Sequence, residues 1–283
     1  MRIRADTTGD EIRRCATGLL TQSRSRMERA LASSVVERDK TVHRVRVDMK
    51  RLRALWYLVQ PGLTSSVCKR LHEQTRALAG SLSGQRDYAV MLDTLASLKS
   101  GIAADEYHQI ERVIERALKP AADPGRPLIM ALHHLDDLQA GVMLVDWASV
   151  RRLHIEQGLK RTGLKSETLK RSALQCSDRE ALHRWRKWCK LWLYQLLWLV
   201  PEARWRWMQQ LKPLGSALGR VHDLDVLQTL LADVPESQGA VLQQAWSRQR
   251  RKALRQVEGS SRKVYARPAR VRCRMACNSW LKY

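Results

Sequence analysis

The stretch that decides the fold is His43–Val59, which reads HRVRVDMKRLRALWYLV. It contains no proline or glycine and few β-branched residues, so it predicts a helix. At about 100° per residue its apolar residues share one broad face, formed by Val45, Met49, Leu52, Leu55, Trp56 and Val59. Beside that face runs a basic row at spacings of three, four and three, formed by His43, Arg46, Lys50 and Arg53. Because stacked cations repel one another, the row indicates that an anion faces it.

A second copy of this pattern lies at His183–Val200, which reads HRWRKWCKLWLYQLLWLV. Its basic residues repeat the first two spacings of the row at an offset of 140 residues, and they are His183, Arg186 and Lys190. Its apolar face consists of Trp185, Cys189, Trp192, Leu196 and Leu199. The copy is imperfect, because Leu193 stands where the first copy has its last arginine.

The segments that follow the two copies also match. Leu78–Leu95 reads LAGSLSGQRDYAVMLDTL, and Leu211–Leu231 reads LKPLGSALGRVHDLDVLQTLL. At an offset of 136, Arg86-Asp87 aligns with His222-Asp223. Two motifs repeated in the same order at nearly one offset predict an internal duplication, against the alternative of chance similarity between basic helices. We expect each of these segments to form a helix–turn–helix.

The predicted fold class is all-α, with two similar helical bundles related by internal duplication. No run of residues shows the alternation of a strand. We expect one domain over 1–283, with a first repeat at 1–140 and a second at 145–283. The expected helices are 10–40, 41–60, 65–82, 105–119, 128–145, 147–173 and 178–200, where Pro61-Gly62 ends the second and Ser177 or Asp178 caps the last. Gly158 and Gly163 predict a weakened or kinked helix in their region.

The composition limits the classes of binding partner that the chain is expected to have. The chain of 283 residues has 51 Lys plus Arg against 28 Asp plus Glu, a formal charge of +23. This excess predicts a polyanionic partner, which is nucleic acid, an anionic membrane surface or a phosphate polymer. The six cysteines lack zinc-site spacing and suggest reduced thiols in the cytoplasm. The first residues carry no apolar signal core, and no apolar run is long enough to span a membrane.

These motifs resemble the CHAD domain, the conserved histidine α-helical domain, whose two halves carry HxxRxxxKRLR. The first copy matches through Arg53, while the second departs at Leu191, Trp192 and Leu193. Tyr194 and the C-terminal YARPARVRCRMACNSW also resemble the family. The resemblance implies a helical domain that binds inorganic polyphosphate in a basic groove between its halves. It leaves open whether the protein sits on polyphosphate granules.

A polyphosphate chain carries about one negative charge per unit and has no bases to read, so its binder needs Arg and Lys side chains. Arg76 and Lys212 lie 11 residues before Asp87 and Asp223 and are plausible further contacts. The full set of expected polyphosphate contacts is His43, Arg46, Lys50, Arg53, Arg76, Lys160, Arg161, Lys165, His183, Arg186, Lys190 and Lys212. For the two histidines a structural role at the helix start and a phosphate-donor role are both open.

We expect no catalytic residue, no cofactor and no metal ion. Asp87 and Asp223 are interpreted as caps of the following helix that also orient groove cations. The pairs His133-His134 and Asp136-Asp137 are interpreted as surface polarity, because adjacent helical residues point about 100° apart. Trp185 and Trp192 lie on an apolar face and are expected in the core rather than as platforms for bases.

Three functions compete at this point. The first is a non-enzymatic polyphosphate-binding protein. The second is an enzyme of phosphate-chain metabolism, which is disfavoured because the chain has no Glu-x-Glu, no P-loop and little carboxylate clustering. The third is a nucleic-acid-binding basic helical protein, which explains the charge equally well but lacks a known nucleic-acid motif. The sequence gives no oligomeric state.

Overall fold

The computed structural model describes residues 3, 8–100, 102–118, 125–176, 178–200, 205–232 and 240–281, without the side chains of 8, 84–86 and 240. Every regular element within these ranges is a helix, and no strand occurs in them. The all-α fold class is therefore confirmed.

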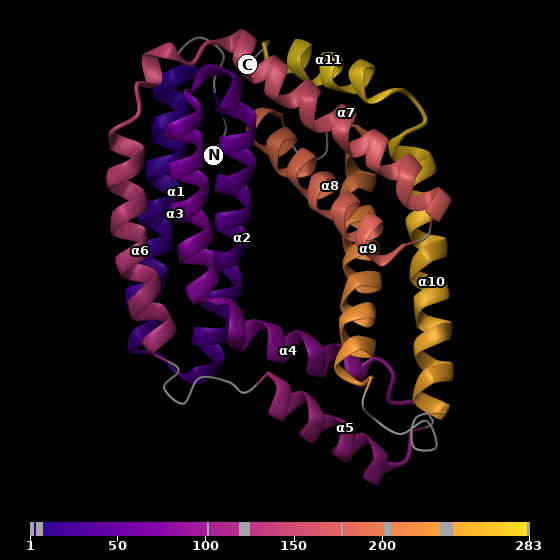
Figure 1. Cartoon of the computed structure of the whole chain (residues 1–283). Coiled ribbons are helices and arrows are strands. Elements are labelled where there is room, and N and C mark those ends of the chain that lie inside the picture. The colour runs from indigo at the N-terminus through magenta and orange to yellow at the C-terminus, as the bar shows by residue number, and fades with distance from the viewer. Residues whose placement is uncertain are drawn as a thin grey trace.

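Four helices of the first half pack side by side (Figure 1). They are α1 (Thr8–Leu31), α2 (Val35–Val59), α3 (Ser65–Ser81) and α6 (Arg126–Met143). Helices α1 and α3 each contact both α2 and α6. The helix α2 carries the first basic row, and a short 3₁₀ turn at Gln60–Gly62 follows it.

Two helices of the first half leave this group and reach the second half. They are α4 (Ser83–Ala96) and α5 (Ala104–Ala117), which cross the lower part of Figure 1. A small separate core joins them to α9, where Leu95 and Ile114 belong to the same buried cluster as Leu224. The first half is therefore attached to the second half at this end of the molecule as well.

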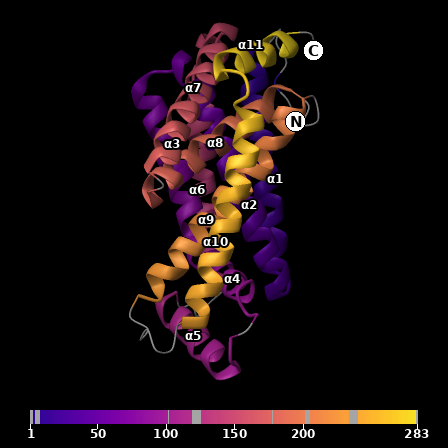
Figure 2. The same ribbon diagram turned by 90° about the vertical axis from the view of Figure 1, so that its right-hand side faces the viewer.

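A 3₁₀ turn at Trp147–Ser149 leads into the second half. The helices of this half are α7 (Arg152–Cys176), α8 (Arg179–Leu199), α9 (Arg206–Leu230), α10 (Ala240–Val264) and α11 (Ala269–Trp280). Helix α8 lies between α7 and α9, α10 packs along α9, and α11 packs on α7. Figure 2 shows α7 and α11 at one end of the molecule and α4 and α5 at the other.

One main core runs through both halves and contains fully buried tryptophans. Trp56 of α2, Trp185 and Trp192 of α8, and Trp280 of α11 all belong to it. The expectation that Trp185 and Trp192 lie in the core is therefore confirmed. In each half the signature helix packs against the helix before it and the helix after it, which are α1 and α3 for α2, and α7 and α9 for α8. The origin of the halves by duplication and the repeat boundaries remain predictions.

The predicted boundary between the first two helices was wrong. The first helix ends at Leu31 rather than near residue 40, and α2 begins at Val35. The Ser34 side chain accepts a hydrogen bond from the Glu37 backbone N–H and caps α2, so the Ser33-Ser34 pair is the true breakpoint. At the second signature helix, Asp178 accepts bonds from the Glu180 and Ala181 N–H groups as expected, and Ser177 lies outside the described residues.

The predicted helix–turn–helix occurs only in the first half. There Leu82 separates α3 from α4, and the Ser81 and Ser83 hydroxyls donate to the backbone carbonyls of Leu78 and Gly80. The aligned positions of the second half carry Ala217 and Gly219, which have no hydroxyl, and α9 continues through them.

The glycines predicted to weaken α7 lie within a single helix. A Cβ at Gly158 would collide with the Leu58 carbonyl of α2, and one at Gly163 would lie 2.7 Å from the Cys273 Sγ of α11. These glycines therefore allow α7 to approach its neighbours closely.

Candidate functional site

The two signature helices pack against each other across the halves. The Gln195 side chain donates to the Ala54 carbonyl at 3.2 Å, and the Trp198 indole donates to the Arg51 carbonyl at 3.1 Å. The Arg51 guanidinium also lies over the Trp198 ring at 5.1 Å. Helix α2 therefore contacts α8, α8 contacts α9, α9 contacts α4, and α4 returns to α2, which closes a circuit of four helices (Figure 1).

Arg46, in the first basic row, bridges α2 to the junction of α3 and α4. One nitrogen of its guanidinium donates to the Leu82 carbonyl at 2.9 Å, and the other lies 3.3 Å from Asp87 Oδ1. Asp87 lies inside α4, and no side chain caps that helix, so the predicted cap at Asp87 was wrong. Its carboxylate nevertheless contacts a row cation.

Arg186 and Lys190, in the second row, run along α9. A Cβ at Gly219 would lie 3.5 Å from Arg186 Nε, and one at Gly215 would lie 3.5 Å from Lys190 Cγ, which are ordinary van der Waals distances and show that both side chains lie against α9. Asp223 lies within the continuous α9, so its predicted capping role was also wrong. Its negative charge acts on both cations.

We call Arg186 and Lys190 the α8–α9 basic pair. Burial lowers the pKa of Lys190, and the neighbouring Arg186 cation lowers it further. Burial likewise lowers the pKa of Arg186, and its Nε is buried without a hydrogen-bond partner among the described residues. Burial and mutual repulsion of the two cations favour an anion beside them, and the Asp223 carboxylate supplies part of that negative charge.

His183 contacts a partner that the sequence analysis did not identify. Its ring lies against that of His222 in α9, with centroids 4.2 Å apart and an interplanar angle of 32°. Burial is the main cause that lowers the pKa of each histidine to about 4. Both rings are therefore neutral at pH 7.

Three more of the expected contacts meet at His72 of α3. Burial and then the cations Arg53, Arg76 and Arg161 lower the pKa of His72 to about 4. These arginines come from α2, α3 and α7, and we call the four residues the His72 cluster. The sequence analysis missed His72, although it lies one helical turn before Arg76 on the same face.

Aromatic rings connect the His72 cluster with α8. The Tyr57 ring lies 4.5 Å from the His72 ring and 5.5 Å from the Trp188 ring, measured between centroids. Arg161 donates to the Tyr57 carbonyl at 3.2 Å and to Gln60 Oε1 at 2.6 Å. Trp188 and Lys190 are two residues apart on α8, so their side chains point to nearly opposite sides of that helix.

The remaining expected contacts are dispersed. Lys160 lines a cavity between α7 and α11, away from Arg161, because consecutive helical residues point about 100° apart. Lys165 is exposed on α7, Lys212 is exposed on α9, and His43 is exposed on α2. The structure therefore groups part of the set and separates Lys160 from it.

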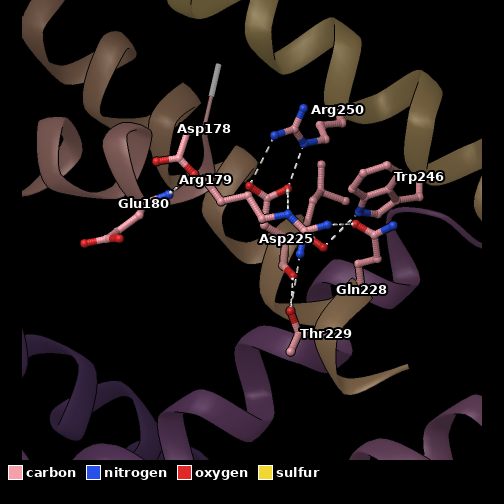
Figure 3. A network of polar contacts seen from close by, with 9 residues as sticks. Asp178, Arg179, Glu180, Asp225, Gln228, Thr229, Trp246 and Arg250 are labelled. Carbon is pink, nitrogen blue, oxygen red and sulfur yellow. Dashed lines mark hydrogen bonds and ion pairs between the residues drawn. The ribbon is translucent and has the colours of Figure 1, made fainter. Parts of the chain in front are cut away.

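A buried carboxylate that the sequence analysis did not single out joins α9 to α8 and α10 (Figure 3). Asp225 is 6% exposed and accepts from Arg250 of α10 at 2.7 and 3.4 Å, while Arg179 of α8 lies 3.9 Å away. The Trp246 indole donates to the Leu224 carbonyl at 2.8 Å. These contacts fix α9 and thereby the positions of His222 and Asp223 on it.

Two further findings concern ligands and membranes. Within the described ranges, no group of three or more His, Cys, Asp or Glu side chains is arranged to hold a metal ion. Over the same ranges, none of the helices combines the length and apolar character that crossing a bilayer requires. In the His133-His134 and Asp136-Asp137 pairs, which the sequence analysis placed on the surface, Asp136 forms an ion pair with Arg24 and the His133 side chain is exposed.

Comparison with known proteins identifies the family. No curated protein matches the sequence significantly. The solved structure of PptA from Streptomyces chartreusis is 16% identical with a TM-score of 0.59, covering 91% of this chain and 98% of that one. The crystal structure of the CHAD domain from the plant Ricinus communis is 17% identical with a TM-score of 0.56, covering 98% and 94%. These likenesses concern the fold, whereas the CHAD domain model matches the sequence itself over residues 18–232. The chain belongs to the CHAD-domain family.

Proposed function

We propose that this protein binds inorganic polyphosphate through the basic side chains of α2, α3, α7 and α8, and that it does not hydrolyse the polymer. The observation that carries the proposal is the α8–α9 basic pair, Arg186 and Lys190. Their two cations are held side by side and partly desolvated, with Asp223 nearby. The Asp223 carboxylate offsets part of the repulsion between the two cations, and the same cations are placed to bind a ligand with closely spaced negative charges.

The His72 cluster extends this surface. Its three arginines come from three different helices, and their charges all act on a histidine whose pKa is lowered to about 4, chiefly by burial. Arginine offers paired N–H donors that match phosphate oxygens. We expect the phosphate chain to contact these arginines as well as the basic pair.

Four tryptophans of α2 and α8 are unavailable as platforms for nucleic-acid bases. Proteins that bind single strands present aromatic rings on which bases stack. Trp56, Trp185, Trp192 and Trp198 are each at most 1% exposed, so they serve the core. Backbone-only binding of nucleic acid remains the second candidate, supported by the charge of +23.

The acids near the basic rows interact with the row cations, which supports the non-enzymatic part of the proposal. Asp87 contacts Arg46, and the charge of Asp223 acts on Arg186 and Lys190. Carboxylates that neutralise row cations are suited to orienting those cations. Association with polyphosphate granules in the cytoplasm would follow from this binding.

Competition binding tests the proposal. Labelled polyphosphate is bound to the protein at one stated salt concentration and displaced with unlabelled polyphosphate, duplex DNA or single-stranded RNA of equal total charge. We expect polyphosphate to displace the label at the lowest concentration, and Arg186→Gln with Lys190→Gln to weaken binding at least tenfold, as for the loss of hydrogen bonds to charged groups. Displacement by DNA or RNA at equal or lower concentration would instead favour the nucleic-acid function.

A further inference from the structure

A cavity of about 450 Å³ lies between α7 and α11, apart from the basic rows. Lys160 of α7 lines it together with Arg270 and Arg274 of α11. The two arginines are one helical turn apart and therefore share a face of α11. Three cations from two helices thus surround one hollow at the end of the molecule where Figure 2 shows α7 and α11.

These three cations have no acidic partner within the parts of the chain that the structure describes. The acid that lines the cavity with them, Glu156, accepts from Arg152 at 2.8 Å. Its charge is therefore offset by a different arginine. Because like charges gathered in one hollow repel one another, the cavity favours an anion.

Two buried cysteines strengthen this preference. Cys273 and Cys277 also line the cavity, and they are 2% and 6% exposed. Burial raises the pKa of each thiol to about 12, so both are neutral at pH 7 and act as small apolar groups. Charge-assisted hydrogen bonds are stronger beside such a surface than in open water. Asn278 adds an amide at the rim.

The other side of α7 faces different partners. Arg161, the next residue after Lys160, contacts Tyr57 and Gln60 of the first half. Lys160 therefore belongs to a separate site from the His72 cluster. A ligand between α7 and α11 would touch residues of the second half alone.

We propose that this cavity is an independent site for a small phosphate oxyanion, with Arg270, Arg274 and Lys160 as its donors. The guanidinium groups would bind phosphate oxygens in paired fashion, and the lysine would act as a mobile point charge. A volume of about 450 Å³ is sufficient for a phosphate or diphosphate group. The site does not depend on the proposed function of the basic rows.

Calorimetric titration with pyrophosphate tests the site in the full chain. The background carries Arg186→Gln and Lys190→Gln, which removes the basic pair. We expect pyrophosphate binding to persist in this background and to weaken at least tenfold when Arg270→Gln and Arg274→Gln are added, because hydrogen bonds to a charged group are lost. The matched control is Arg251→Gln with Arg255→Gln, two exposed arginines at the same spacing on α10.

Lys160→Gln provides a second variant that leaves α11 unchanged, and circular dichroism checks the fold of each protein. We expect this single change to weaken pyrophosphate binding several-fold even if the α11 variant fails to fold. Absence of pyrophosphate binding in the background protein overturns the proposal. Equal losses from the α11 and α10 variants, or an unchanged affinity in Lys160→Gln, also overturn it.

Discussion

The rings of His183 in α8 and His222 in α9 pack at a tilt of 32° with their centroids 4.2 Å apart, and the pKa of each is lowered to about 4. Burial is the largest cause, and the cations Arg186 and Lys187 add to it, whereas the carboxylate of Asp225 opposes the shift at His222. The motif histidine is thus a neutral packing partner at pH 7 when no anion is present.

This pair predicts a dependence of stability on pH. Unfolded histidine titrates near 6.5 and the folded pair near 4, so the unfolded chain binds more protons between these values. The free energy of unfolding should therefore fall as the pH is lowered from about 6.5 to about 4, and His72 contributes with the same sign. Urea denaturation at a series of pH values measures the effect. We expect His222→Gln to flatten the slope, and a variant as steep as the wild type would contradict the assignment.

The same pair predicts that polyphosphate binding takes up protons. A phosphate group beside Arg186 offsets the cation that opposes protonation, so the pKa of His183 and His222 should rise on binding. Because the bound state then holds more protons, affinity should increase as the pH falls from 7 toward 5. Calorimetry at pH 6 in two buffers of different ionisation enthalpy gives the number of protons. A heat of binding that is the same in both buffers would mean that binding takes up no protons and would contradict this prediction.

The acids near the basic rows should act on structure rather than on chemistry. Asp87→Asn breaks a contact with Arg46 in which the acid is 54% exposed, so the loss in unfolding free energy should be about 0.2–1 kcal/mol. Affinity for polyphosphate should fall only modestly, because Arg46 also donates to the Leu82 carbonyl. Chemical denaturation and a phosphate-release assay are run on both proteins. A wild type that hydrolyses polyphosphate, together with a folded Asp87→Asn that does not, would refute the non-enzymatic proposal.

Local signals predicted the parts of the fold that depend on neighbours in sequence. The apolar face of His183–Val200 and the cap at Asp178 need only helical periodicity and one hydrogen-bonding side chain. The break between α3 and α4 lies at Ser81 and Ser83, whereas the aligned Ala217 and Gly219 lack a hydroxyl, so α9 continues although Asp223 matches Asp87.

Contacts between helices that are distant in the sequence could not be predicted from the sequence alone. Asp225 and Arg250 are 25 residues apart on different helices, and nothing in their local patterns links them. Lys160 and Arg161 are adjacent in sequence, yet one faces α11 and the other faces α2. Helical periodicity gives the angle between two side chains, whereas the identity of the neighbouring helix follows from tertiary packing.

The last prediction concerns the first basic row, where Lys50 and Arg53 are one turn apart on α2. Lys50→Glu with Arg53→Glu should weaken polyphosphate binding at least a hundredfold, because two favourable contacts become repulsive ones. Each lost phosphate contact should also reduce the slope of log K against log salt by about 0.7–0.9, by analogy with nucleic acids.

The control for this change must alter net charge equally without disturbing the fold. Arg13 and Arg14 near the N-terminus are unsuitable, since Arg14 pairs with the buried Glu11. Arg248→Glu with Arg251→Glu has the same spacing and places two exposed side chains on α10. Titrations at several salt concentrations then separate two cases. A much larger loss from the α2 variant locates the polyanion on the basic row. Equal losses and equal slopes would mean that the whole charged surface attracts it, and that the repeated motif serves packing alone.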